Sequence, residues 1–506
     1  MIAHNLPGVF PSVVHMLNAT CTKWPEREAI VCGPRRLSYR EYRDLVSGFA
    51  QELLRRNARG KRVLLLLGNS IEICIAMFAI HSVSGQAIAL NPLYTYSELK
   101  GLISDAEPEI ILYDDLSHEV VVNLKDFLKS ESIQLFRMDE NYKARDILSE
   151  PQPSSIATIQ YTGGTTGKPK GAILTHSNIA INISQRQALL PTSDAGERIL
   201  SVLPLFHVYG MAMCLYNSVL SGASLIILPR YTPESLIELF NAEAISIFAG
   251  SPTIFTGLMS YAGFGTIDFS PLKFSYSGSA PLSPSILSSW EQATGAPVLE
   301  GYGLSEAGPV VSFNPLDGRR KAGSVGKNVP LTEVKIVSPI DGSKSTDPGL
   351  KGEVCIRGPQ LMLGYRNRTE ETTLALRDGW LYTGDIGEFD SEGYLYITDR
   401  VKDMIIVSGY NVYPREIEDL LYKYDAILEA AVVGVTDPYR GEIVKAYIAA
   451  VQGSNLQISD LEVYCKKHLA KYKVPSHFEI ISELPKTIVG KIDKIALRKR
   501  NNDQIQ

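Results

Sequence analysis

The sequence has 506 residues, of which 45% are hydrophobic and 21% are charged, so it is too long for one ordinary domain and we expect at least two. Fifty basic and 55 acidic residues give a formal net charge of −5, which argues against a nucleic-acid-binding protein because such proteins usually present a basic face. The six cysteines are widely spaced and form no CxxC pair, which argues against a zinc site or a disulfide framework and favours a reducing, cytoplasmic environment.

Strand and helix patterns alternate along the first four hundred residues. Short apolar runs without polar alternation predict strands buried on both faces at 62–68, 109–114, 224–229 and 245–251. Segments with helical spacing predict helices at 38–55 and 233–243. The apolar stretch 71–90 is interrupted by Glu72, His81 and Gly85, so we expect a packed helix followed by a strand rather than a membrane span. This alternation predicts an α/β fold with parallel sheets.

The sequence is dense in turns rich in glycine and tyrosine up to residue 398, and this pattern ends near residue 400. Beyond it, the pattern predicts a compact unit with helices at 416–424 and 459–468 and strands at 430–435 and 444–451. We place the boundary at 399–402, which gives a large domain over 1–398 and a small one over 399–506.

The strongest local signal is the segment YTGGTTGKPKG at 161–171, which combines four glycines, three threonines and two lysines. Glycine lets backbone N–H groups approach phosphate oxygens, threonine adds hydroxyl donors and lysine adds positive charge. A Walker A loop is excluded, because Thr162 stands where its first glycine must be and Pro169 follows the lysine. Taken alone, the segment is equally typical of a surface turn rich in small residues.

The loop does not stand alone, and with its companions the sequence resembles the adenylate-forming superfamily, which includes acyl-CoA synthetases, luciferase-like enzymes and peptide-synthetase adenylation domains. Within it, the sequence is most similar to fatty-acid:CoA ligases. The further family-like blocks are LPLFHVYG at 203–210, SGSAPL at 277–282, EGYGLSEAG at 300–308, GEVCIRGPQLMLGY at 352–365, WLYTGDIGEFDSEGYLYITDR at 380–400, KDMIIVSGYNVYPREIE at 402–418 and LPKTIVGKIDK at 484–494.

The resemblance implies a fold and a reaction. The fold is a large N-terminal domain of parallel-sheet α/β subdomains with a smaller barrel-like part, followed by a small mobile α+β C-terminal domain. The enzyme would join a carboxylic acid to ATP with Mg²⁺, forming an acyl-adenylate and pyrophosphate, and then pass the acyl group to CoA, releasing AMP. Attack of a carboxylate on a phosphate brings two anions together, so the site must neutralise charge and align the groups.

The resemblance also assigns residues to the nucleotide. Glu306 matches the family's magnesium ligand, Tyr302 the aromatic residue beside adenine, Asp385 the acceptor of both ribose hydroxyls, and Arg400 a ribose and phosphate contact. The remaining nucleotide-binding residues implied are Thr162, Gly163, Gly164, Thr165, Thr166, Gly167, Lys168, Lys170, Ser279, Ala280, Pro281, Gly303 and Ser305. Ser305 departs from the family's usual threonine but keeps its hydroxyl.

The resemblance gives the C-terminal part three functions. Lys491 matches the lysine that bridges the substrate carboxylate and the α-phosphate, and Lys402 falls at the hinge about which the small domain rotates. A tunnel for the pantetheine thiol is implied at Ser408, Gly409, Tyr410 and Asn411. The implied catalytic set is Lys491, Thr165, Thr166, Glu306 and His207.

The acid pocket is implied at His207, Val208, Tyr209, Gly210 and Gly301. Family members that take amino acids carry an aspartate where this chain has His207, so no buried anion is offered to an ammonium group. The pocket wall, at 207–211, 248–252, 277–281, 301–303 and 310–311, is small and mostly apolar. We expect a medium- or long-chain fatty acid, and an aryl or phenylpropanoid acid stays open as an alternative.

Other readings compete with a CoA ligase. A P-loop ATPase or kinase lacks support, because the Walker spacing fails and no kinase motif set is present. A non-catalytic protein on the same scaffold is disfavoured by the presence of Lys491 and Glu306. The sequence leaves open whether the acceptor thiol belongs to CoA or to a carrier protein, whether the enzyme is a monomer or a homodimer, and whether its surface touches a membrane weakly.

Overall fold

The structure is a computed structural model. It describes residues 6–503 apart from 139–141, 143, 145, 163–168, 339–343, 346–347, 401–402, 408–409, 438–440 and 488–490. For 344–345, 410–411, 441 and 501–503 only the backbone is described.

The first part of the chain contributes most of a seven-stranded sheet with the strand order β19-β8-β7-β4-β3-β5-β6. The strands from β7 to β6 run parallel, while β8 and β19 add antiparallel pairs at the edge. Its strands are β3 (Arg62–Leu66), β4 (Gln86–Ala89), β5 (Ile110–Tyr113), β6 (Gln134–Arg137), β7 (Ile156–Thr162), β8 (Lys170–Thr175) and β19 (Gly364–Tyr365).

The second sheet has nine strands in the order β15-β14-β13-β12-β11-β9-β10-β1-β2, and its six central strands are parallel. Strands β9, β10, β11 and β12 are buried along almost their whole length, as apolar runs in parallel sheets require. The strands are β1 (Glu28–Cys32), β2 (Arg35–Ser38), β9 (Arg198–Ser201), β10 (Ser224–Ile227), β11 (Ile247–Gly250), β12 (Phe274–Ser277), β13 (Val298–Gly303), β14 (Val310–Phe313) and β15 (Lys327–Asn328).

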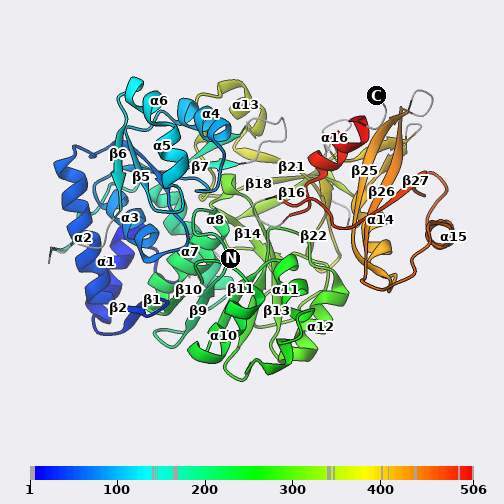
Figure 1. The fold of residues 1–506 in the computed structure, drawn as a ribbon, viewed down its shortest axis with the longest axis horizontal. Helices are drawn as coiled ribbons and strands as arrows, with labels where there is room; N and C mark the ends of the chain where they lie inside the picture. Colours follow the sequence, from blue (N-terminus) through cyan, green and yellow to red (C-terminus); the bar gives the residue numbers. More distant parts are fainter. Residues whose placement is uncertain are drawn as a thin grey trace.

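Helices pack on these two sheets and fill the large part of the molecule (Figure 1). They are α1 (Val13–Lys23), α2 (Tyr39–Arg55), α3 (Ile71–Ser82), α4 (Tyr96–Ala106), α5 (His118–Asn123), α6 (Lys125–Ser130), α7 (His176–Leu189), α8 (Val208–Gly210), the π-helix η1 (Met211–Tyr216), α9 (Asn217–Ser221), α10 (Pro233–Glu243), α11 (Pro252–Met259), η2 (Phe264–Thr266), α12 (Pro284–Thr294) and η3 (Ser305–Ala307).

A curled sheet of six antiparallel strands follows, and it corresponds to the barrel-like part expected from the sequence. Its elements are β16 (Glu333–Val337), β17 (Lys344–Ser345), β18 (Gly352–Arg357), β20 (Leu376–Arg377), β21 (Trp380–Phe389) and β22 (Leu395–Arg400), with α13 (Thr369–Ala375) beside them. The predicted fold class is therefore confirmed.

The C-terminal part of the chain folds around a five-stranded sheet of its own, at the right of Figure 1. This sheet consists of β23 (Ile405–Val407), β24 (Tyr410–Val412), β25 (Ile427–Asp437), β26 (Gly441–Ala450) and β27 (His477–Ile481), with helices α14 (Pro414–Leu421), α15 (Ile458–His468) and α16 (Lys494–Asp503). Its buried side chains, among them Ile417, Val432 and Leu461, form a hydrophobic cluster separate from the main core.

Local sequence signals explain why the predicted helices begin where they do. Thr232 caps α10 by accepting a hydrogen bond from the Ser235 N–H, and Pro233 fills the first helical position. Ser38 belongs to the cap of α2 rather than to its first turn, because it forms a capping box with Glu41. The stretch 71–90 is helix α3 followed by strand β4, as predicted, and no helix within the described residues is long and apolar enough to cross a membrane.

Two fully buried histidines pack edge to face between α3 and α7. The rings of His81 and His176 lie 5.2 Å apart at 84°, and neither ring nitrogen of His176 has a hydrogen-bond partner among the described residues. Burial lowers the pKa of His81 well below its usual value, and burial together with the charge of His15 lowers the pKa of His176 to about 4.

We predict from this pair that the protein loses stability in mild acid. The unfolded chain takes up protons near pH 6.5 and the folded chain does not, so stability is complete above pH 6.5 and falls as the pH approaches 4. His176 alone should contribute a loss of about 2 kcal/mol between pH 7 and pH 5. Thermal unfolding of wild type and His176→Leu at both pH values checks this, and an equal pH dependence in the two proteins would contradict it.

Candidate active site

The predicted phosphate loop leaves the seven-stranded sheet between β7 and β8. Gly163–Lys168, which include the predicted catalytic residues Thr165 and Thr166, lie outside the described residues. The two ends of the loop are placed, because Thr162 and Lys170 face each other in the antiparallel register and the Thr162 hydroxyl donates to the Lys170 carbonyl oxygen at 3.5 Å. The two strands that flank the loop are therefore hydrogen-bonded to each other within the sheet.

Glu306 lies close to this strand pair. It belongs to the short helix η3, directly after β13, and its carboxylate oxygen Oε1 accepts a 2.8 Å hydrogen bond from the Tyr365 hydroxyl. The Lys170 ammonium lies 5.3 Å from the centre of the Tyr365 ring. Burial raises the pKa of Glu306, and the hydrogen bond from Tyr365 opposes that rise.

Tyr302, Asp385 and Arg400 form one connected group. The Tyr302 hydroxyl donates to Asp385 Oδ2 at 2.5 Å, and Arg400 Nε lies 3.0 Å from Asp385 Oδ1. Asp385 and Arg400 face each other across the β21–β22 pair, and Tyr302 reaches them from β13 of the nine-stranded sheet. The Asp385 side chain is 8% exposed while Arg400 is 46% exposed, so the group ends at an open face.

The SGSAPL block turns sharply after β12. Ser279 has a backbone φ of +70°, in the left-handed region that non-glycine residues rarely adopt. Ser279 and Ala280 are half-buried, Pro281 is exposed, and all three follow the carboxyl end of a parallel strand. Such local strain persists only where the surroundings enforce it, and it is commonly found at binding sites.

Lys491 reaches this group from the C-terminal part of the chain. Its pKa is lowered to about 8, first by burial and then by the Arg400 charge, while the Asp385 charge opposes the shift. The Lys491 charge also acts on His207, so this lysine interacts electrostatically with groups from segments that are far apart in the sequence. Its backbone is held by hydrogen bonds in both directions with Thr487.

His207 caps the helix that begins at Val208. Its ring nitrogen Nδ1 accepts a 3.3 Å hydrogen bond from the Tyr209 N–H, which places the ring proton on Nε2. Burial, and then the Lys491 charge, lower the pKa of His207 to about 4. His207 is therefore a neutral imidazole at physiological pH, able to donate one hydrogen bond through Nε2.

Tyr209 contacts two other segments of the predicted acid pocket. Its hydroxyl donates to the Gly250 carbonyl oxygen at 3.3 Å, and a Cβ atom at Gly278 would lie 3.0 Å from its ring. Gly210 follows, where a Cβ atom would lie 2.4 Å from the Pro204 carbonyl oxygen, so only glycine fits. Val208 lies on the same turn, and Gly301 lies on β13 against the ring of Phe313.

Some predicted site residues cannot be placed. Lys402, Ser408 and Gly409 lie outside the described residues, and Tyr410 and Asn411 are described only as backbone in β24. Gly303 and Ser305 are placed beside Tyr302 and Glu306 by their positions at the end of β13 and in η3.

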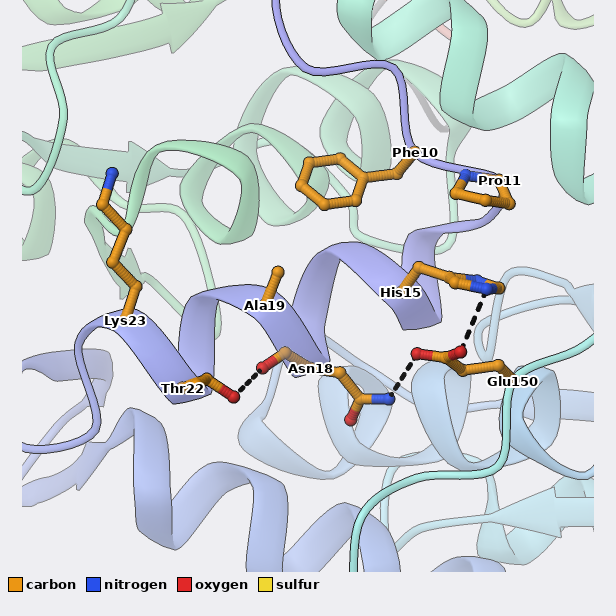
Figure 2. A pocket seen from close by; sticks show the side chains of 8 residues that line it. All are labelled: Phe10, Pro11, His15, Asn18, Ala19, Thr22, Lys23 and Glu150. Carbon is orange, nitrogen blue, oxygen red and sulfur yellow. Dashed lines mark hydrogen bonds and ion pairs between the residues drawn. The ribbon is translucent and has the colours of Figure 1, made fainter.

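A hollow of about 530 Å³ on the outer side of α1 shares no residue with the predicted site. Figure 2 shows that His15 and Asn18 both contact the Glu150 carboxylate there. The hollow is therefore a feature separate from the residues that the sequence singles out.

Tyr365 is the residue of this site that sequence reasoning missed. It is the last residue of the block GEVCIRGPQLMLGY, so the signal was present, but nothing in the sequence linked it to Glu306, 59 positions earlier. The pairing of β19 with β8 and the hydrogen bond from the Met362 N–H to the Glu306 carbonyl oxygen bring them together.

Comparisons with known proteins identify the family of the chain. Residues 17–366 match the family described as AMP-binding enzyme, and residues 416–491 match the AMP-binding enzyme C-terminal domain. The chain is 35% identical to a long-chain-fatty-acid–CoA ligase of Bacillus subtilis and 34% identical to one of Escherichia coli O157:H7, in each case over 97% of this chain and 95% of the relative.

Among solved structures, ATP-bound MatB from Rhodopseudomonas palustris superimposes with a TM-score of 0.90 at 27% identity, over 98% of this chain and 100% of that one. The apo structure of the same protein superimposes with a TM-score of 0.79 over the same shares of both chains. The family match covers well over half of the chain and the relatives are similar over nearly their full length. The chain therefore belongs to the AMP-binding enzyme family of adenylate-forming enzymes, as its motifs predicted.

Proposed function

We propose that this enzyme is an ATP-dependent fatty acid:CoA ligase acting on medium- or long-chain acids. The names of its relatives in Bacillus subtilis and Escherichia coli support the substrate class. The observation that carries the proposal is that the Lys491 ammonium interacts electrostatically with His207 and with the ion pair of Arg400 and Asp385.

In the first half-reaction, an oxygen of the acid attacks the α-phosphorus of ATP, and the bond from that phosphorus to the bridging oxygen breaks to release pyrophosphate. The Lys491 ammonium and the Arg400 guanidinium supply positive charge where the two anions meet. The loop between Thr162 and Lys170 would hold the outer phosphates. Asp385 would accept the ribose hydroxyls beside Tyr302, whose ring would lie against adenine.

The site also fits a magnesium ion carried by the nucleotide. Magnesium is usually held by one or two carboxylates together with substrate phosphates, and Glu306 offers a half-buried carboxylate next to the phosphate-loop strands. Bound there, the ion would neutralise phosphate charge. Tyr365 and the backbone bond from the Met362 N–H to the Glu306 carbonyl oxygen hold this residue in place.

The acid end of the site favours an uncharged substrate tail. His207 is neutral, Tyr209 uses its hydroxyl on a backbone carbonyl oxygen, and Gly278 leaves room for the Tyr209 ring. An acyl chain gains by leaving water, whereas an ammonium group would lack a buried anion to pair with.

For the second half-reaction, we propose that residues 399–506 rotate as a small domain about Lys402 against a large domain of residues 1–398. The backbone at 408–411 would then line the path of the CoA thiol, whose sulfur attacks the acyl carbon and displaces AMP. The higher similarity to ATP-bound than to apo MatB supports the view that the present arrangement is the one for adenylation.

We predict that the fall of the adenylation rate at alkaline pH, its alkaline limb, reflects deprotonation of Lys491. Its pKa of about 8 in the free enzyme means that the ammonium, present below pH 8, is lost above it, so kcat/KM for ATP should fall above pH 8. Pyrophosphate release measured across pH 6–10 checks this. In Lys491→Arg the remaining activity should lack this limb, because guanidinium stays charged; an unchanged limb would assign it to another group.

The decisive test of the function is a panel of acids with ATP and magnesium, with and without CoA. The panel runs from acetate to long-chain fatty acids and includes cinnamic, benzoic and amino acids. Release of AMP that needs a fatty acid and CoA, with the acyl-CoA detected by mass, is the expected result. Release of pyrophosphate without a thioester would point to a carrier-protein thiol as the acceptor. Turnover of cinnamic acid but of no fatty acid would indicate a phenylpropanoid ligase. ADP as the product would overturn the proposal.

A further inference from the structure

Tyr365 connects two parts of the nucleotide site that belong to different sheets. Its hydroxyl donates to Glu306 Oε1 at 2.8 Å, and Glu306 follows β13 of the nine-stranded sheet. Its backbone belongs to β19 of the seven-stranded sheet, paired through Ala172 with the strand that leaves the phosphate loop. The ammonium of Lys170, at the loop's end, lies 5.3 Å from its ring.

The backbone around Tyr365 is held on both sides, so the hydroxyl has little freedom. The Tyr365 N–H donates to the Thr372 hydroxyl at 2.9 Å, and the Arg366 N–H donates to the Gly171 carbonyl oxygen at 2.8 Å. Gly364, just before it, has a φ of +150° and lies against Thr372. A residue fixed in this way can orient its partner rather than follow it.

We propose that Tyr365 is a positioning residue that orients the Glu306 carboxylate for the metal–nucleotide complex. A carboxylate has two oxygens, so a hydroxyl that occupies one of them fixes the plane of the group and leaves the other for a cation. Outer hydrogen bonds of this kind orient metal-ligating groups, and losing one typically weakens metal binding tenfold or more. This inference rests on the metal role proposed for Glu306.

The test measures metal binding rather than turnover. Full-length enzyme is saturated with the non-hydrolysable α,β-methylene analogue of ATP, and Mn²⁺ binding is followed by the loss of its free-ion electron paramagnetic resonance signal. Tyr365→Phe, which removes only the hydroxyl, should weaken Mn²⁺ binding to the complex about tenfold. Tyr394→Phe removes a buried hydroxyl that donates to the Arg319 carbonyl oxygen, and it should leave Mn²⁺ binding within about twofold.

A double-mutant cycle with Glu306→Gln separates the two proposals. If Tyr365 acts through Glu306, adding Tyr365→Phe to Glu306→Gln should weaken Mn²⁺ binding no further. Weaker binding in Glu306→Gln with unchanged binding in Tyr365→Phe, or fully additive losses, would overturn the positioning role and leave the proposed function intact. Unchanged binding in Glu306→Gln would instead overturn the metal role of Glu306. Melting temperatures close to wild type show that each variant is folded.

Discussion

Replacing Lys491 with alanine is expected to slow acyl-adenylate formation by about a thousandfold. The ammonium interacts with the charges of Asp385 and Arg400 and with His207, and burial strengthens its action on other charges. A thousandfold loss corresponds to about 4 kcal/mol of transition-state stabilisation, which is the size expected for one positioned charge. The measurement is the rate of acid-dependent pyrophosphate release.

The same variant should retain thioester formation from supplied acyl-adenylate within about threefold, because the proposed rotation of residues 399–506 moves Lys491 out of the site before the thiol attacks. Lys486→Ala is the matched control. Lys486 lies in the same segment, but its ammonium pairs with Glu429 at 2.8 Å on an exposed face, so both half-reactions should stay near wild type. Equal losses in the two half-reactions of Lys491→Ala would contradict the assigned role.

Local patterns were enough to predict most of the large part of the fold. The run at 62–68 forms β3 and the helix at 233–243 has the predicted bounds, because unbroken apolar runs and strong caps leave few alternatives. In the small part, the predicted helix at 416–424 is shifted to Pro414–Leu421, since Pro414 occupies its first position. Such boundaries depend on caps more than on periodicity.

The site itself could be predicted only through the family resemblance. Nothing in the local sequence links Lys491 to His207, because their electrostatic interaction depends on how the C-terminal part is placed against the sheets. The π-helix at Met211–Tyr216 and the buried pair of His81 and His176 likewise left no periodic signal. They are produced by packing between segments, which composition and spacing do not encode.

Replacing Asp385 with asparagine is expected to raise the KM for ATP by about 30-fold to 100-fold. The carboxylate accepts from Tyr302 and Arg400 and keeps acceptor capacity for two ribose hydroxyls, whereas an amide would offer N–H groups to these same donors. Each charge-assisted hydrogen bond contributes about 1.5–3 kcal/mol, so the net loss of one such bond accounts for this range. The ATP dependence of pyrophosphate release, with calorimetric titration of ATP, gives the affinity directly.

The charge of Asp385 also supports protonation of Lys491, so Asp385→Asn should move the alkaline limb of adenylation to lower pH. Asp390→Asn is the control on the same hairpin, because Asp390 pairs with Lys321 and accepts backbone N–H groups at the turn before β22. That variant should keep both the KM for ATP and the alkaline limb. If Asp385→Asn lowered kcat while ATP bound normally, Asp385 would act by holding Arg400 for the reaction rather than by holding the ribose.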